Sequence, residues 1–197
     1  MLVNKCESMF AGAPPSFFNK DVTGKSETFK ALRATDLLSN GYLATEGLQD
    51  VEVKEGRNIE RFLLQEGDVV LLARGSSMRC CIVTQEAAKE RLLATANFIV
   101  LRLKQEHRSE FLVAYFNSPP GKQALAHNDV SVSTNVMKSL SLSGLKKLEV
   151  PFPALEVQKK IAELFHVHVA AQQAALALIE EQKKAVDVKI LDLMGAI

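Results

Sequence analysis

The sequence has few cysteines, and they form no paired framework. Cys6, Cys80 and Cys81 are odd in number and show no Cys-x-x-Cys spacing, which argues against a disulfide scaffold. This usage is typical of a reducing cytosol. We therefore expect a cytoplasmic protein in which Cys80 and Cys81 are small buried side chains without chemistry.

Long apolar runs are also missing. Nowhere do about 18 uncharged apolar residues follow one another, as a membrane-spanning helix would require. The N-terminus, MLVNKCESMFAGAPPSFF, has no long apolar core behind a basic start, so it does not read as a secretory signal. These absences predict a soluble protein with no membrane partner.

Neither sign of charge dominates, because 24 Lys and Arg oppose 23 Asp and Glu. The field of the whole molecule therefore gives no reason to expect attraction to polyanions, and any positive site must be local. One stretch is locally basic, since Lys122, Lys138, Lys146 and Lys147 face only Asp129. Such a run is either a solvated face or part of a nucleic-acid interface.

The length and the 47% hydrophobic content fit one compact domain with an appendage. The pattern predicts an α+β fold, with a mixed α/β domain over residues 1–153 and a long helix over 154–197. Residues 1–25 read as an irregular lead-in. Strands are expected at Thr28–Ala34, Val51–Val53, Ile59–Leu64, Val69–Ala73, Met78–Thr84, Asn97–Leu103 and Leu145–Phe152.

Beyond His107 the apolar period lengthens towards that of a helix. Helices are predicted from about Ser109, and over Gly121–His127. The polar segment Asn128–Asn135 reads as a surface loop, and Arg74–Ser77 as a turn.

From about Leu155 to Leu193 no residue breaks a helix, which would be a rod on the order of 55 to 60 Å long. Its apolar positions follow strict four-three spacing, the pattern of a coiled-coil seam. The alternative is a helix lying along its own domain. The seam consists of Phe165, Val169, Gln172, Leu176, Ile179, Lys183, Val186, Ile190 and Leu193.

No motif predicts catalysis. The segment Asn117–Gly121, NSPPG, lacks the aromatic residue of a methyltransferase clamp and reads as a break between helices. Glu66 and Asp68 have no lysine partner at nuclease spacing, so we expect a solvated turn. His107 and His127 are expected at the surface with no acidic cluster, and no metal site or cofactor is predicted.

What remains is a binding surface. Two polar segments combine small hydroxyl and amide side chains with Arg and Lys, the groups that contact phosphates and base edges. Ser, Thr and Asn also simply form turns. The candidate DNA-contacting residues are Arg74, Ser76, Ser77, Arg79, Ser131, Ser133, Thr134, Asn135 and Lys138.

The segment Leu145–Phe165, LKKLEVPFPALEVQKKIAELF, resembles the end of a target recognition domain in the specificity subunits of type I restriction-modification systems. The likeness runs from about Thr28 to the end of the chain. It includes Gly67-Asp68-Val69 before an apolar strand and Tyr115–Pro119 between two helices. The closing residues that carry it are Leu148, Val150, Pro151, Pro153, Gln158 and Ile161.

The resemblance implies a non-catalytic subunit that recognises double-stranded DNA through the major groove. It also implies docking to methyltransferase (modification) subunits and, through them, to a restriction subunit. Members of this family usually carry two recognition domains and two long helices, whereas this chain has one of each. We therefore expect a homodimer paired through the long helix, which would require a palindromic bipartite target.

Two other interpretations stay open. The chain could be the specificity module of another DNA-methylating defence system. It could instead be a protein-interaction adaptor with a dimerising helix, which the near-neutral charge slightly favours.

Overall fold

The computed structural model describes residues 1–22, 27–75, 78–127, 130–133 and 138–195. The chain forms two compact units, Met1–Ala162 and Glu163–Ile197. The sequence placed the domain boundary at residues 153/154, whereas the first unit also contains the opening turns of helix α5. Gln158 and Ala162 of those turns are buried.

The first unit is built around a four-stranded antiparallel sheet. Strand β4, VVLL, is buried along its whole length, because sheet neighbours lie on both of its edges and apolar side chains cover both faces. In spatial order the sheet consists of β1 (Cys6–Ala11), β8 (Phe98–Leu103), β4 (Val69–Leu72) and β6 (Cys80–Ile82).

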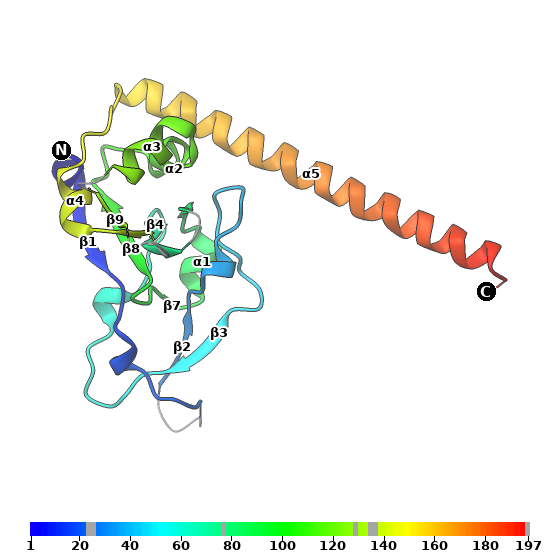
Figure 1. Cartoon of the computed structure of the whole chain (residues 1–197), viewed down its shortest axis with the longest axis horizontal. Coiled ribbons are helices and arrows are strands. Elements are labelled where there is room, and N and C mark those ends of the chain that lie inside the picture. Colours follow the sequence, from blue (N-terminus) through cyan, green and yellow to red (C-terminus); the bar gives the residue numbers. More distant parts are fainter. Residues whose placement is uncertain (23–26, 76–77, 128–129, 134–137, 196–197) are drawn as a thin grey trace. The chain divides into compact units, whose positions relative to one another are not determined.

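The irregular lead-in predicted for residues 1–25 is wrong, because β1 pairs with β8 along the edge of this sheet (Figure 1). Its sequence, CESMFA, gives no clear alternation, and a register shift between Cys6 and Ser8 interrupts the ladder. The strand is formed by hydrogen bonds to a partner about ninety residues away, for which the local sequence has no signal.

Two three-stranded sheets complete the strands. In the first, β2 pairs antiparallel with β3 and parallel with β7; its strands are β3 (Gln49–Glu52), β2 (Thr28–Ala31) and β7 (Leu92–Leu93). The second contains β5 (Arg74–Gly75), β10 (Lys138–Leu140) and β9 (Ser131–Ser133). The turn predicted at Arg74–Ser77 therefore begins with strand β5, and the surface loop predicted at Asn128–Asn135 contains strand β9.

The helices of the first unit are short. Ser118 caps α3 by accepting a hydrogen bond from the Gly121 N–H at 3.3 Å, and Pro119 occupies the first helical position, where a proline is tolerated. They are α1 (Gln85–Lys89), α2 (Ser109–Asn117), α3 (Pro119–Ala126) and α4 (Leu142–Lys147), with 3-10 turns at Leu2–Lys5, Pro15–Phe17, Ala34–Asp36 and Glu60–Phe62.

Two predicted strands are wrong. Instead of a strand at Leu145–Phe152, helix α4 continues to Lys147 and residues 148–152 have no regular secondary structure. The helix starts because the Ser141 hydroxyl accepts from the Gly144 N–H at 3.3 Å. The segment Ile59–Leu64 contains a 3-10 turn, which buries Phe62 and leaves the two charged residues before it exposed.

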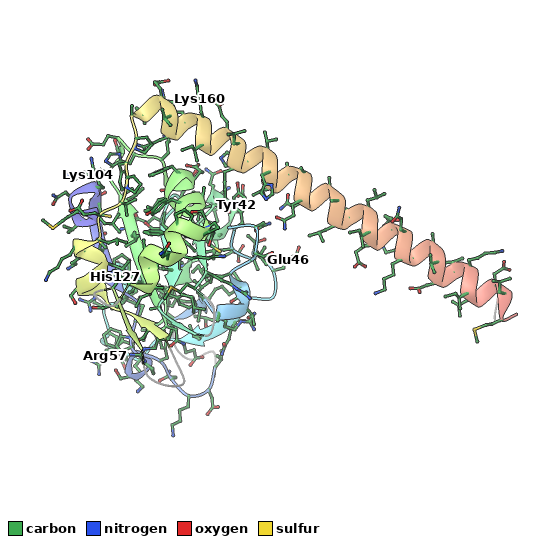
Figure 2. The ribbon with its side chains drawn as sticks, turned by 45° about the horizontal axis from the view of Figure 1, so that its top comes forward. Tyr42, Glu46, Arg57, Lys104, His127 and Lys160 are labelled. Carbon is green, nitrogen blue, oxygen red and sulfur yellow. The ribbon has the colours of Figure 1, made fainter. Side chains whose placement is uncertain are left out.

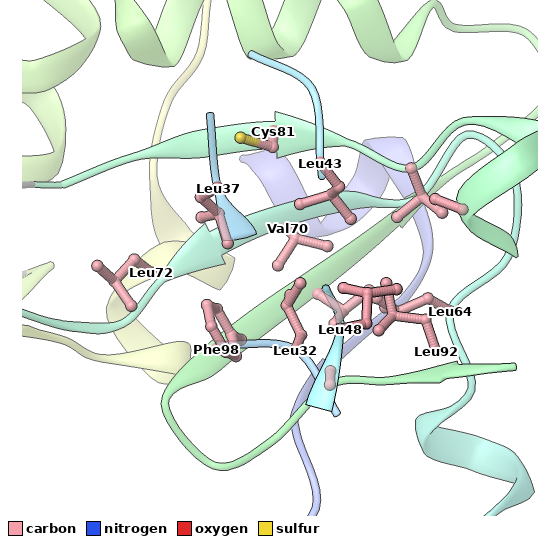
Figure 3. Packing of buried hydrophobic residues seen from close by; sticks show 14 residues of the cluster. Leu32, Leu37, Leu43, Leu48, Leu64, Val70, Leu72, Cys81, Leu92 and Phe98 are labelled. Carbon is pink, nitrogen blue, oxygen red and sulfur yellow. The ribbon is translucent and has the colours of Figure 1, made fainter. Parts of the chain in front are cut away.

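The core lies between the four-stranded sheet and the loops that cover it. Figure 3 shows Val70 and Cys81 of neighbouring strands beside Leu37 and Leu43 of the loop that follows β2. A second cluster, rich in phenylalanine, packs Phe29 and Phe62 against Leu93. This buried apolar surface supplies the main stabilisation of the domain.

Helix α5 (Leu155–Leu193) confirms the predicted long helix and is continuous over 39 residues (Figure 1). Five apolar seam residues of the second unit are 49 to 76% exposed, whereas Val169 is buried. The exposed five are Leu176, Ile179, Val186, Ile190 and Leu193. Among the described residues no helix is long and apolar enough to cross a membrane.

Candidate nucleic-acid interface

The small sheet β5–β10–β9 joins the two polar segments that the sequence predicts as a binding surface. Lys138 lies opposite Gly75 on one side and Ser133 on the other, and Ser139 lies opposite Arg74. Backbone segments more than sixty residues apart are thus hydrogen-bonded neighbours. Strand register, rather than loop proximity, brings these candidates together.

Buried contacts fix this sheet to the domain. The Leu140 N–H donates to the Ala73 carbonyl at 2.7 Å, and the Ser141 N–H donates to the Val130 carbonyl at 2.7 Å. Val130 and Leu140 are both buried. The polar strands are therefore held by apolar anchors at their ends, as recognition segments on a rigid scaffold usually are.

The structure places the candidate residues as follows. Arg74 lies on β5 and Arg79 just before β6, and both are exposed. Ser131 and Ser133 are on β9, and Lys138 is on β10. The remaining four candidates, Ser76, Ser77, Thr134 and Asn135, lie outside the described residues.

Contacts with the backbone of two other segments hold Arg79 in place, and neither segment was predicted to belong to the site. One of its Nη atoms donates to the Leu37 carbonyl at 3.1 Å, and its own carbonyl accepts from the Leu72 N–H at 3.0 Å. A guanidinium has five N–H donors, so this contact leaves others available on the exposed side chain.

Asn117 supports the same strand. Its Oδ1 accepts from the Cys80 N–H at 3.1 Å, and its Nδ2 donates to the Cys80 carbonyl at 2.7 Å. This side-chain amide therefore replaces a neighbouring strand along the edge of β6, directly beside Arg79. Asn117, the first residue of the NSPPG segment, therefore has a structural role, which its hydrogen bonds to the distant Cys80 backbone reveal.

The solvated turn predicted at Glu66–Asp68 is wrong for Asp68, which is fully buried, whereas Glu66 is exposed. The Arg102 guanidinium donates to it through Nε and Nη2, both at 2.8 Å. The Gln65 N–H also donates to it at 2.9 Å. Hydrogen bonding to Asp68 raises the pKa of Arg102. The carboxylate is thus committed to a structural ion pair.

His107 was expected at the surface, and this is wrong. Its side chain is 8% exposed, and its ring lies 4.9 Å from the Phe152 ring, centroid to centroid. Burial lowers the pKa of His107, and the nearby Lys5 lowers it further. His127, in contrast, is exposed as predicted (Figure 2).

The cysteines are free and buried, which confirms the prediction for Cys80 and Cys81. Burial raises the pKa of the Cys6 and Cys81 thiols to about 12, so they stay protonated at neutral pH. In the described part of the chain, no three His, Cys, Asp or Glu side chains gather as metal ligands would.

The fold defines an α+β domain with polar strands on a rigid scaffold, continued by a long helix. Comparison with known families identifies its class, because residues 16–186 match the type I restriction modification DNA specificity domain. The chain belongs to this family, and the resemblance noted in the sequence is confirmed. No curated protein matches the chain significantly.

Solved structures share the fold at low sequence identity. The HsdS subunit from Thermoanaerobacter tengcongensis is 15% identical with a TM-score of 0.61, and the match covers 93% of this chain and 45% of that one. A structure described as showing complex assembly and conformational transition of the type I R-M system is 17% identical with a TM-score of 0.57, covering 97% and 43%.

The type I restriction-modification S subunit from M. genitalium is 16% identical with a TM-score of 0.51, covering 93% of this chain and 41% of that one. The present chain therefore spans less than half the length of each of these three structures.

Proposed function

We propose that this chain is a DNA sequence-specificity component of a type I restriction-modification system and recognises one half-site of a bipartite target. The observation that carries the proposal is the family match, which runs through the recognition domain and most of helix α5. In this role the chain selects the site and performs no chemistry. Its three free cysteines fit a cytoplasmic location beside the DNA.

In this proposal, the sheet β5–β10–β9 faces the DNA. Arg74 and Arg79 supply charged donors, and Arg is the residue that most often makes bidentate contacts to guanine. The hydroxyl-bearing residues Ser131 and Ser133 lie on strand β9, which β10 separates from β5. Serine as a residue type can contact either phosphates or base edges.

Helix α5 is proposed to pair with a second copy. Its exposed apolar seam, Leu176 to Leu193, would be an unfavourable surface for an isolated helix in water. Two copies related by a two-fold axis would present two recognition domains, and the target would then be palindromic. The helical pair would set the separation of its halves.

The pairing predicts an oligomeric state. We expect the wild-type chain to sediment as a dimer at micromolar concentration, and the double substitution Ile179→Glu and Val186→Glu to sediment as a monomer with an intact domain. Glu163→Gln, on the same helix but outside the seam, is the matched control. A wild-type monomer at that concentration, with or without DNA, would remove homodimerisation from the proposal.

The family also suggests the other partners. We propose that the chain docks methyltransferase subunits and, through them, a restriction subunit. One of the similar structures is described as showing complex assembly of the type I R-M system, which supports this proposal. Affinity purification from the native host, followed by identification of the bound subunits, separates this system from other DNA-methylating defence systems.

DNA binding itself is tested with duplex DNA at several salt concentrations. We expect salt-dependent binding that weakens when Arg74 and Arg79 are changed to Ala, by roughly 1 to 3 kcal/mol for each arginine that pairs with a base. Lys189→Ala, an exposed cation paired to Asp192 on helix α5, serves as the control. Binding that the Arg variants leave unchanged would mean that another face meets the DNA. A chain that binds no duplex at low salt would favour the adaptor interpretation.

A further inference from the structure

A shallow cavity of about 330 Å³ lies outside the candidate interface. Its lining carries two arginines, an asparagine and an aromatic ring, and no carboxylate. Figure 2 shows Arg57 at the surface of the domain. The lining residues are Phe17, Gly56, Arg57, Asn58 and Arg61.

An aromatic platform orients the two arginines. Phe17 and Phe62 form an edge-to-face pair with ring centroids 5.8 Å apart. The Arg57 guanidinium carbon lies 5.1 Å from the Phe17 centroid, and that of Arg61 lies 4.4 Å from the Phe62 centroid. Such contacts restrict a guanidinium while its N–H donors stay available at its rim.

The backbone fixes the platform to the turn that carries Arg57. The Lys54 N–H donates to the Phe17 carbonyl at 2.9 Å, and the Arg57 N–H donates to the Lys54 carbonyl at 3.2 Å. Asn58 accepts from the Glu60 N–H through its Oδ1 at 3.2 Å, which leaves its amide N–H groups as donors. The cavity is therefore lined by hydrogen-bond donors, and backbone hydrogen bonds hold the turn that carries Arg57 in place.

Neither arginine forms an ion pair within the described part of the chain, although Glu27 and Glu55 line an adjoining pocket with Arg57. Both side chains are exposed, and each guanidinium lies over an aromatic ring without a carboxylate partner among the described residues. Arg91 offers the contrast, because it also lies over a phenylalanine ring, that of Phe29 at 4.2 Å, but forms an ion pair with Glu27. Two unpaired guanidinium groups beside one cavity suit a tetrahedral oxyanion.

The cavity and the sheet β5–β10–β9 lie beyond the same end of the four-stranded sheet. Leu72, the last residue of β4, pairs with Phe98, and the chain continues from there to Arg74. The Gly12 N–H donates to the Phe98 carbonyl at 3.0 Å, and that segment continues to Phe17. The chain therefore reaches both places from the same end of this sheet.

We propose that this cavity binds a phosphodiester of the DNA backbone, with Arg57 and Arg61 as the contacting residues. The inference rests on the proposed function and adds to it an anchor that carries no sequence information. Backbone contacts of this kind fix the register of a protein on the duplex while other residues read the bases.

The test measures binding of the full-length chain to a duplex of mixed sequence between about 50 and 200 mM salt. The double variant Arg57→Gln and Arg61→Gln, which loses this one phosphate contact, should reduce the slope of log affinity against log salt by about 0.9, and each single variant should reduce it by less. The same double variant should bind weaker on the order of 8-fold near 100 mM salt. Arg91→Gln, the matched control, should keep the wild-type slope, and thermal unfolding should confirm that all variants fold.

A double variant with the wild-type slope, beside a wild-type chain that binds duplex, would overturn the phosphate site and leave the proposed function standing. An equal loss of slope in Arg91→Gln would overturn it too, because the effect would then follow net charge. A wild-type chain that does not bind duplex at all would overturn the proposed function, and this inference with it. Loss of binding to a polyglutamate peptide, with the DNA slope kept, would assign the cavity to an acidic protein and would also contradict the proposal.

Discussion

His107 is a buried titratable residue beside the end of the recognition domain. It contacts Phe152, which also packs against Phe111 at 5.3 Å between ring centroids. Burial is the largest cause of its lowered pKa; Lys5 and Lys104 act in the same direction, and Glu106 opposes them. The folded state therefore favours the neutral imidazole.

This shift predicts a loss of stability in acid. Below the ordinary pKa of 6.5 the unfolded chain takes up a proton that the folded chain resists, so the free energy of unfolding falls as pH drops from there. This contribution cannot exceed about 1.4 kcal/mol per pH unit. His107→Phe, which keeps an aromatic contact to Phe152, should have a shallower loss between pH 7 and pH 5 in urea titrations, and equal pH dependence of the two proteins would contradict the assignment.

Single residues were predictable where their neighbours in sequence decide their surroundings. Cys80 and Cys81 lie in an apolar run and are buried as expected. His107 follows a polar stretch and looked exposed, but a ring 45 positions later covers it. Asp68 was predicted to be solvated because its ion-pair partner, Arg102, lies on another strand and is not visible in the local sequence.

At the scale of elements, the corner between α2 and α3 depends on one glycine. A Cβ atom on Gly121 would lie 1.9 Å from the Tyr115 carbonyl oxygen, which is a backbone atom that cannot simply rotate away. The corner in turn holds Asn117, which hydrogen-bonds both backbone groups of Cys80. Packing at this corner therefore positions the edge of β6 beside Arg79.

We predict that Gly121→Ala lowers the free energy of unfolding by roughly 2 to 4 kcal/mol, because the two helices must separate. Gly47→Ala is the control: nothing lies within 4 Å of its added Cβ, and its φ of +67° leaves only a conformational cost of about 1 to 2 kcal/mol. Urea denaturation of both variants measures the difference. A Gly121→Ala midpoint at or above that of Gly47→Ala would show that the corner can relax.

Elements with a local signal were predicted, and elements formed by distant pairing were not. The apolar run of β4, the change of period at α2 and the unbroken α5 all follow from short-range pattern. β1 depends on β8 and gives no such pattern. At the candidate interface, the sequence supplied the residue types, whereas the register that places Lys138 between Gly75 and Ser133 comes from tertiary pairing.

At the scale of the whole molecule, a net charge of +1 means that the proposed DNA binding must depend on local positive sites. The proposed base-reading strands and the proposed phosphate cavity lie beyond one end of the central sheet. In the proposed dimer, helix α5 supplies the seam for a second copy. In this account the chain determines which DNA sequence is bound, and other subunits carry out methylation or cleavage.

Mapping methylated bases in the genome of the native host, with and without this chain, tests most directly whether the chain determines which DNA sequence is methylated. We predict a palindromic bipartite motif that is methylated only when the chain is present and that is lost with the Ile179→Glu and Val186→Glu variant. A methylation pattern that stays the same when the chain is deleted would contradict the account.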